Sequence, residues 1–231
     1  MDDQEGDNHD PLERPHITPE LLLRAYAAGY FPMAEHAESE DLFWMSPRQR
    51  GVLPLDGFLL SRSLEKTIRS KRFTVYADQD FEAVISACAQ TRPDTWINQR
   101  IRTLYSQLFE AGYVHTLECF HDGQRVGGLY GLALGRVFFG ESMFHTMRDA
   151  SKVALAHLVV RLRLGGFILL DTQFVTPHLA SLGGVEMAQP DYQNRLQEAL
   201  QGHAVFSLWP DDQPDDPDLV LKHLKQRSIR L

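Results

Sequence analysis

Apolar residues recur at intervals of three and four positions in several stretches of the chain. This spacing places them on one face of a helix and predicts helices over residues 81–89 and 97–111. A further helix is expected over residues 61–71. The longest predicted helix follows Asp149, carries leucine and valine on one face, and ends at Gly165.

Continuous apolar runs predict the strands. Residues 114–120 and 125–134 flank an Asp-Gly pair, which is a strong β-hairpin signal. Two more runs, residues 137–141 and 167–171, lie on either side of the longest helix. An antiparallel meander followed by a helix and another strand indicates an α+β fold with a mostly antiparallel mixed sheet, like that of the N-acetyltransferases (GNAT-like).

The ends of the chain differ in character from its centre. A helix start at Thr18-Pro19, with Gly29 as its end, lies well before the predicted sheet. The first residues are acidic and polar, which favours disorder. We therefore predict four parts: a disordered acidic tail (1–15), a small N-terminal domain (16–60), a GNAT-like catalytic domain (61–210) and a C-terminal tail (211–231).

The net charge of −8 is concentrated near the two ends. Residues 1–15 and 211–218 each contribute −5, so the rest of the chain carries +2 and the global sign identifies no partner. One compact basic segment, called the basic run below, comprises Lys66, Arg69, Lys71 and Arg72. Such a segment is commonly a solvated helix face, and it is also the natural place for phosphate contacts.

Composition also bears on the compartment. No apolar run approaches the roughly 18–20 residues that span a membrane, and the acidic start lacks the features of a signal peptide. The two cysteines, Cys88 and Cys119, lie in separate segments without metal-ligand spacing, and the histidines are scattered. We therefore expect a reduced cytoplasmic monomer without a membrane partner and without a metal.

Three polar side chains occur where two apolar strands end. Glu141 ends one strand, and Asp171 and Gln173 lie at the end of the next. A charged group among apolar side chains costs several kcal/mol unless a cation or a hydrogen-bond donor meets it. Glu141 can pair with Arg148, and Asp171 can simply cap the next loop. Two strand ends with this chemistry beside an apolar wall nevertheless favour a site.

The segment after Glu141 bears on the acyl donor. A transferase that uses acetyl-CoA holds the pyrophosphate in a glycine-rich turn before a helix N-terminus. The corresponding turn here, residues 142–149, contains no glycine and is crowded with bulky side chains. A CoA-dependent small-molecule N-acyltransferase is therefore kept only as the alternative function.

Eight short motifs occur in one order along residues 17–200. They are Ala28-Gly29-Tyr30-Phe31-Pro32, Trp44-Met45-Ser46-Pro47, Thr95-Trp96-Ile97, Gly127-Gly128-Leu129-Tyr130-Gly131, Gly140-Glu141-Ser142-Met143-Phe144, Asp149-Ala150-Ser151-Lys152, Leu170-Asp171-Thr172-Gln173 and His178-Leu179-Ala180-Ser181-Leu182-Gly183. In this set the chain resembles the leucyl/phenylalanyl-tRNA–protein transferase family. The resemblance implies an enzyme that moves Leu or Phe, and Met to a lesser degree, from aminoacyl-tRNA to the N-terminal Arg or Lys of acceptor proteins, which marks them for N-degron degradation.

The chemistry implied by this resemblance is simple. An aminoacyl-tRNA ester is already activated, so no cofactor, ATP, metal or protein nucleophile is required. The reaction needs a neutral α-amine held against the ester carbonyl, and positioning can supply much of the rate. The resemblance implies that Asp171 is hydrogen-bonded to Gln173, whose amide oxygen accepts from the attacking amine. It also implies that Glu141 contacts the basic end of the peptide.

An apolar pocket for the aminoacyl side chain is predicted from Phe138, Met143, Leu158 and Leu162. The two leucines lie one helical turn apart and face the same way, and methionine follows irregular shapes well. All four can instead be ordinary core, and the two readings are compatible because such a pocket is a gap in the core. The pocket should prefer side chains that are unbranched at Cβ.

The 3′ end of the tRNA needs a surface on which the terminal adenine can stack. Trp96 matches the stacking tryptophan of the family, and Tyr105 matches a nearby tyrosine. Many members have a second tryptophan where this chain has Met33, so the predicted stacking surface has one aromatic side. Stacking is worth about 1–3 kcal/mol per base. The basic run is predicted to contact tRNA phosphates.

Overall fold

The small N-terminal domain consists of one helix and a two-stranded sheet. The computed structural model describes residues 17–39, 41–91, 95–208 and 212–226, so the predicted acidic tail (1–15) lies outside the described residues. Helix α1 (Pro19–Ala27) is followed by the antiparallel pair β1 (Phe31–Ala34) and β2 (Leu42–Met45). Thr18 caps α1 as predicted, because its side chain accepts a hydrogen bond from the Leu21 N–H (3.2 Å).

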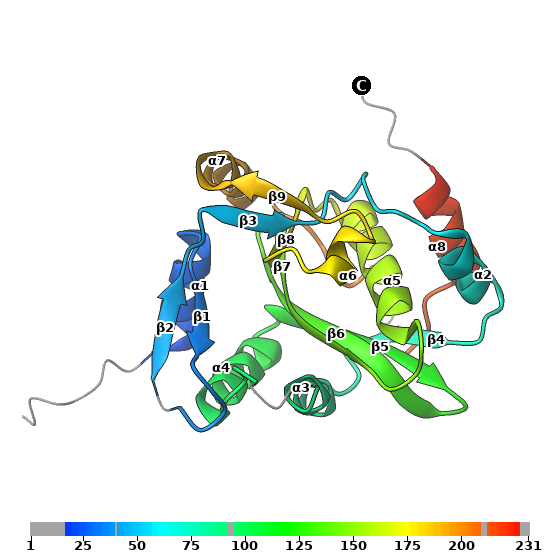
Figure 1. The fold of residues 1–231 in the computed structure, drawn as a ribbon, viewed down its shortest axis with the longest axis horizontal. Coiled ribbons are helices and arrows are strands. Elements are labelled where there is room, and N and C mark those ends of the chain that lie inside the picture. The colour runs from blue at the N-terminus through cyan, green and yellow to red at the C-terminus, as the bar shows by residue number, and fades with distance from the viewer. Residues whose placement is uncertain (1–16, 40, 92–94, 209–211, 227–231) are drawn as a thin grey trace, which may run out of the picture.

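The main sheet has seven strands in the order β4-β5-β6-β7-β8-β3-β9 (Figure 1). They are β3 (Gln49–Val52), β4 (Thr74–Ala77), β5 (Val114–His121), β6 (Gln124–Leu134), β7 (Val137–His145), β8 (Leu169–Gln173) and β9 (Val185–Ala188). Neighbouring strands are antiparallel except for β7 and β8, which are parallel. The predicted fold class is confirmed: a small N-terminal domain precedes an acetyltransferase-like domain with a mixed, mostly antiparallel sheet.

The parallel strands β7 and β8 pair over only three positions. Their last pair joins Phe139 and Asp171, although β7 continues to His145 and β8 to Gln173. Beyond this pair β7 remains bonded to β6, and β8 remains bonded to β3. The two strands therefore separate immediately before Glu141 and at the end of β8, where the sequence predicted the site.

Helices cover both faces of the main sheet. They are α2 (Arg62–Arg69), α3 (Phe81–Ala89), α4 (Gln99–Glu110), α5 (Ala150–Gly165), α6 (Pro177–Ala180), α7 (Gln189–Leu200) and α8 (Pro217–Lys225). The long helix α5 packs on β5, β6 and β7, and it is joined on that face by α2 and α8. Helices α1, α3, α4 and α7 bury their apolar side chains in a second core cluster on the other face. The result is a three-layer arrangement with a core on each side of the sheet (Figure 1).

Local signals in the sequence predicted several elements well. The hairpin turn between β5 and β6 consists of Asp122 and Gly123, and both have positive φ (49° and 76°), as a type I′ turn requires. The helix predicted over residues 81–89 is α3. The helix predicted from residue 97 begins at Gln99, because the Asn98 side chain accepts from the Ile101 N–H and caps it (2.8 Å).

Two segments differ from the prediction. β3 falls within residues 16–60, yet it pairs with β8 and β9 and so belongs to the main sheet. Residues 212–226, predicted as part of a C-terminal tail, include α8, whose Val220, Leu221 and Leu224 are buried in the core cluster beneath α5. The five aspartates of residues 211–218 concealed this helix, since they read as a solvated segment.

Within the part of the chain that the structure describes, no helix combines the length and apolar character needed to cross a membrane. Among the same residues, no group of three or more His, Cys, Asp and Glu side chains is arranged to hold a metal ion.

Candidate active site

A cavity of about 690 Å³ opens where β7 and β8 separate. Its walls come from β1, the segment before α4, the second half of β7, the first turns of α5, the end of β8 and α6. Both domains therefore contribute to it. The predicted residues Glu141 and Gln173 face this cavity together.

Glu141 enters the cavity from a β-bulge. The β6–β7 ladder passes from Gly131 paired with Gly140 to Tyr130 paired with Ser142, so Glu141 is an extra residue without a partner on β6. A bulge re-aims the side chain of its extra residue and is common next to active sites. The local break in the ladder thus explains why this carboxylate leaves the regular alternation of β7.

The partner of Glu141 is a tyrosine and not an arginine. The Tyr26 hydroxyl donates to Oε1 of Glu141 (2.6 Å), and a further hydrogen bond links Tyr26 to the buried Tyr105 hydroxyl. Arg148, the alternative partner, is 89% exposed and lies nearest Asp149. Burial raises the pKa of Glu141 to about 7, although the hydrogen bond from Tyr26 opposes the shift. The carboxyl group therefore exchanges its proton near neutral pH.

Asp171 lies behind the cavity and is completely buried. Arg50 reaches both of its oxygens, with Nε 3.0 Å from each and Nη2 2.6 Å from Oδ2. The Tyr192 hydroxyl donates to Oδ2 (2.6 Å), and the Gln173 backbone N–H donates to Oδ1 (2.8 Å). Asp171 and Gln173 are thus hydrogen-bonded, but through the backbone of Gln173 and not through its side-chain amide.

Gln173 presents its side chain to the cavity from an unusual backbone conformation. Its φ is +56°, in the left-handed region that side chains other than glycine rarely adopt. The residue is 7% exposed, and Nε2 has no hydrogen-bond partner among the described residues. A buried amide nitrogen without a partner is costly, and a catalytic role is one of the few explanations for such a group in a native fold.

Two of the four predicted pocket residues line the cavity. Met143 and Leu158 do so, together with Leu155, which the sequence did not single out. Phe138 lies in the paired part of β7 and stacks on Phe206 in the core (centroids 5.6 Å apart). Leu162 is one turn farther along α5 and is likewise buried in the core, away from the cavity.

The predicted adenine surface is partly assembled. Met33 and Trp96 both line the cavity, on β1 and just before α4. Tyr105 does not reach it, because its hydroxyl is held beneath the wall by Tyr26. Cys88 also lines the cavity, but burial raises the pKa of its thiol to about 12, so it stays protonated at neutral pH.

The basic run lies away from the cavity. Lys66, Arg69, Lys71 and Arg72 belong to α2 and the turn after it, beside α8 and at the opposite end of the molecule from β1 (Figure 1). Arg69 pairs with Glu65 on its own helix, and Lys71 pairs with Asp218 (2.7 Å). The structure therefore does not bring these side chains to the predicted adenine surface.

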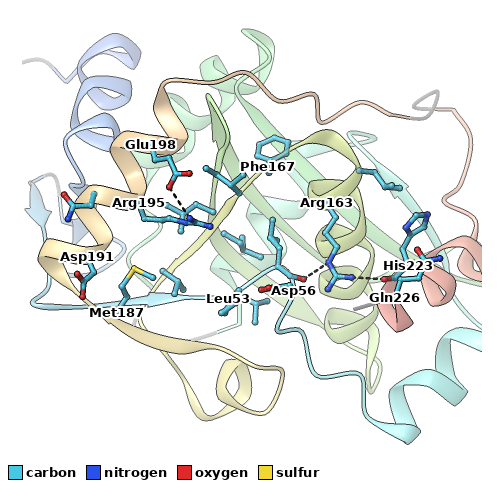
Figure 2. Close-up of a pocket in the computed structure, with 18 residues that line it drawn as sticks. Leu53, Asp56, Arg163, Phe167, Met187, Asp191, Arg195, Glu198, His223 and Gln226 are labelled. Atoms are coloured by element: carbon cyan, nitrogen blue, oxygen red, sulfur yellow. Dashed lines mark hydrogen bonds and ion pairs between the residues drawn. The ribbon is translucent and has the colours of Figure 1, made fainter. Parts of the chain in front are cut away.

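A second hollow, of about 1120 Å³, lies at the other end of β8 (Figure 2). Arg163 there donates to the backbone oxygens of Leu55 (2.6 Å) and His223 (2.8 Å), and Arg195 pairs with Glu198 (3.1 Å). None of the site residues predicted from the sequence lines this hollow. Glu141 and Gln173 line the other cavity, where β7 and β8 separate.

Sequence reasoning missed the partners that hold these groups in place. Arg50 and Tyr192 lie 121 and 21 residues from Asp171 along the chain, and Tyr26 lies 115 residues from Glu141. An arginine in a short strand and tyrosines in amphipathic helices carry no local sign of such roles. The one available signal was Gly51, next to Arg50, since a glycine within a strand can indicate a tightly packed backbone.

Known proteins resemble this chain in sequence and in fold. The family model described as leucyl/phenylalanyl-tRNA protein transferase matches residues 52–197, and the model of the N-terminal domain of the same transferase matches residues 16–48. The crystal structure of FemX is similar in fold, with a TM-score of 0.51 and 12% identity over 76% of this chain and 70% of that one.

Curated relatives extend the similarity over most of the chain. The leucyl/phenylalanyl-tRNA–protein transferase of Rhodopseudomonas palustris (strain HaA2) is 56% identical, with 86% of this chain and 90% of the relative covered. The transferase of Nitrobacter winogradskyi is 54% identical, with 92% of this chain and 96% of the relative covered. The transferase of Cereibacter sphaeroides (strain ATCC 17023) is 52% identical, with 94% of this chain and 100% of the relative covered. The chain is therefore an enzyme of the leucyl/phenylalanyl-tRNA–protein transferase family.

Proposed function

We propose that the enzyme moves Leu or Phe, and Met to a lesser degree, from aminoacyl-tRNA to the N-terminal Arg or Lys of acceptor proteins. This transfer would mark the acceptors for N-degron degradation, with the enzyme acting as a monomer in the cytoplasm. The observation that carries the proposal is that Glu141 and Gln173 line one cavity together with the apolar side chains of Met143, Leu155 and Leu158. A carboxylate, an amide and an apolar pocket are what an amine and an aminoacyl ester require.

Glu141 is suited to receive the acceptor amine. The α-ammonium group of a free N-terminus has a pKa of about 7.7–8.0. A carboxylate with a pKa of about 7 can hold this group and accept its proton without a large energetic mismatch. The hydrogen bond from Tyr26 keeps the carboxylate oriented towards the cavity while this happens.

Gln173 is suited to the carbonyl centre. Its amide oxygen can accept a hydrogen bond from the attacking amine, and Nε2 is a donor without a partner among the described residues. A donor aimed at the carbonyl oxygen of the ester stabilises the negative charge that develops on that oxygen when the amine attacks. The C–N bond then forms, the C–O bond to the ribose breaks, and the ribose oxygen takes up a proton. One proton is released overall when the acceptor begins as an ammonium ion.

The remaining walls suit the two ends of the donor. Met143, Leu155 and Leu158 form an apolar surface for an aminoacyl side chain, while Trp96 and Met33 offer a place for the terminal adenine. The alternative function, CoA-dependent acylation, is not favoured. The turn between β7 and α5, residues 146–149, contains no glycine, whereas a pyrophosphate is held by the backbone of a glycine-rich turn.

The proposed function is tested by transfer of labelled leucine. Leucyl-tRNA is mixed with the enzyme and a peptide that begins with Arg, and the label in the peptide is measured. The same peptide with an acetylated N-terminus is the matched control, because it lacks the nucleophilic amine, and acetyl-CoA replaces leucyl-tRNA in a second arm. We expect labelling of the free peptide only. Acetylation from acetyl-CoA, or no transfer from leucyl-tRNA, would contradict the proposal.

A further inference from the structure

We propose that Arg50 and Tyr192 are positioning residues of this active site, and that Asp171 is one as well. In this view Arg50 and Tyr192 fix the Asp171 carboxylate, the carboxylate fixes a strained turn at Gln173, and the turn aims the Gln173 amide into the cavity. The inference rests on the proposed function, since it concerns the placement of the group that meets the ester carbonyl.

The Asp171 carboxylate is fully engaged by the protein. It accepts bonds from the Arg50 guanidinium on both oxygens, from the Tyr192 hydroxyl, and from the Gln173 backbone N–H. It is completely buried and does not line the cavity. A group with this surrounding cannot touch a substrate, so its influence on the reaction passes through the residues that it holds.

The residue that it holds is in a strained conformation. Gln173 has a φ of +56°, and the Phe174 N–H donates to the Thr172 carbonyl (2.6 Å) across it. An i to i+2 bond around a residue with positive φ is a γ-turn of the rare, strained kind. Such a conformation persists only where the surroundings impose it, and such residues cluster at functional sites. The bond from Gln173 N–H to Asp171 is the nearest such constraint.

The adjacent strand contributes a second constraint. The β3–β8 ladder passes from Gly51 paired with Gln173 to Val52 paired with Asp171, so Thr172 is an extra residue on β8. A Cβ atom on Gly51 would lie 2.4 Å from the carbonyl carbon of Phe174. Only glycine allows β3 to approach the turn this closely. β3 therefore constrains the turn through two consecutive residues. Gly51 packs against the backbone of Phe174, and Arg50 holds the Asp171 carboxylate that binds the Gln173 N–H.

Arg50 is itself held in one orientation. Its guanidinium lies over the Phe31 ring (4.5 Å to the centroid) and the Tyr192 ring (4.6 Å), and Nη1 donates to the Gly29 carbonyl (3.1 Å). A planar guanidinium can stack and bind a carboxylate through two bonds at once, whereas the point charge of lysine cannot. An Arg50→Lys change therefore preserves the charge but removes the geometry.

The chain offers a matched control on the other face of the sheet. Arg161 on α5 binds Asp215 through both oxygens, with His157 as a third member, and all three side chains are buried. None of the three lines the cavity. The Arg161→Lys change alters a buried arginine–aspartate pair of the same type without contact to the site.

The first test compares the two arginine variants on folded protein. With a leucyl-adenosine donor and an Arg-initiated peptide, we expect Arg50→Lys to lower kcat by about 10- to 100-fold, since a misplacement of about 1 Å can cost roughly 10²-fold. The KM for the donor should change little. Arg161→Lys should leave kcat per folded molecule near that of the wild type. Equal kcat values for the two variants would overturn the inference.

The second test uses a milder change, so that it does not depend on Arg50→Lys folding. Tyr192→Phe removes one hydroxyl and keeps the ring over Arg50. We expect it to lower kcat in the wild type but to have no further effect in a Gln173→Ala background, because no amide remains to be misplaced. If the losses multiply instead, Tyr192 acts by another route and the inference fails.

The two proposals fail in different ways. A wild-type enzyme that transfers no leucine refutes the proposed function. An active wild type whose Tyr192→Phe and Gln173→Ala losses multiply refutes only the positioning role. A crystal structure of Arg50→Lys adds a readout that needs no activity: residue 173 should leave the positive-φ region, and an unchanged turn would overturn the inference.

Discussion

Glu141 is one extra residue in β7, and this local irregularity gives it both its direction and its acidity. The bulge turns its carboxylate from the strand's regular alternation towards Tyr26 and the cavity. Burial removes the carboxyl group of Glu141 from water there, and this raises its pKa to about 7. Position and proton affinity thus have the same structural origin.

Glu141→Gln should separate activity from stability. Above pH 7 the variant should have a kcat about 10²-fold lower, the lower end of the usual contribution of a general base. The wild-type rate should rise with pH through a midpoint near 7, and the midpoint in the variant should move towards the amine value of about 7.7–8.0. Initial rates between pH 5.5 and pH 9, a range of roughly two units on either side of these values, provide the measurement.

The same variant should unfold less readily at alkaline pH. The folded-state pKa of Glu141 is raised above the unfolded value of about 4.3, so the wild type loses stability as pH rises from about 4 to about 7. Glutamine carries no such charge and can still accept from Tyr26. Urea unfolding at pH 8 should therefore show the less active variant to be the more stable one. A variant that is both inactive and less stable would point to a structural role.

Met143→Ala should change donor selectivity without abolishing transfer. Shortening this side chain enlarges the cavity, so a bulky donor such as Trp should improve relative to Leu, within the roughly 1–3 kcal/mol that such contacts decide. The measurement is the ratio of Trp to Leu transfer in one preparation. Leu162→Ala is the matched control: it truncates a core residue away from the cavity at a cost of about 2–5 kcal/mol, and its ratio should stay that of the wild type.

The residues at the site divide into those that the sequence could indicate and those that it could not. The sequence could indicate Glu141 and Gln173, because a polar group next to a continuous apolar run is locally visible. The predicted strand end at Glu141 was nevertheless wrong, since β7 continues to His145 and Glu141 lies in a bulge within it. Arg50 and Tyr192 were not, because their partner is distant in the chain and their burial arises only when β3, β8 and α7 meet. Phe138 was misplaced for the same reason: the point at which β7 leaves β8 is not encoded in β7 alone.

Among the elements, those with local signals formed as predicted and those with distant partners did not. The β5–β6 hairpin follows from its Asp122-Gly123 turn, and α3 follows from its apolar spacing. β3 and β9 are four-residue strands at one side of the sheet. β3 pairs with β8 and with β9, and both of these strands follow it by more than 100 residues in the chain. Short strands of this kind carry too little periodicity to be recognised alone.

The basic run of helix α2 can be tested for contacts with tRNA phosphates. If the basic run binds tRNA phosphates, replacing Lys66 and Arg69 with alanine should weaken leucyl-tRNA binding and reduce the salt slope by about 0.7–0.9 for each phosphate that is no longer neutralised. Leucyl-adenosine, which lacks the acceptor stem, should be used normally. Arg195→Ala, another exposed arginine that pairs with a nearby glutamate, is the control and should keep the wild-type slope. An equal reduction in activity with both donors would indicate that these side chains support the folded structure and do not bind tRNA.

In the whole molecule, the C-terminal segment closes the face of the sheet opposite the N-terminal domain. Asp215 lies between His157 and Arg161 of α5, and α8 follows it onto α2 and α5. Burial alone would raise the pKa of Asp215, but the hydrogen bonds from His157 and Arg161 outweigh it and hold the pKa below its usual value. The ionised carboxylate thus ties the last helix to the centre of the fold.

Asp215→Ala should destabilise the enzyme by about 3–5 kcal/mol at pH 7, because it leaves a buried arginine uncompensated. Because the folded pKa is lowered, this contribution is present above about pH 4 and is lost as pH falls below it. Urea unfolding of the wild type and the variant at pH 7 and at pH 3.5 measures the loss of stability and its decrease at low pH. The lower pH is just below the pKa of a free aspartate, which is about 3.9. Asp218→Ala removes only the exposed pair with Lys71 and should cost less than about 1 kcal/mol.

The hydrogen bond from Tyr26 to Glu141 also matters while the chain is being made. Its two residues are 115 positions apart, and the first of them leaves the ribosome long before the second. β1 forms one wall of the cavity, and the strands that form the opposite walls, β7 and β8, are likewise synthesised more than 100 residues later. A nascent or cleaved chain that has only one of the two parts thus has neither an oriented carboxylate nor a closed cavity.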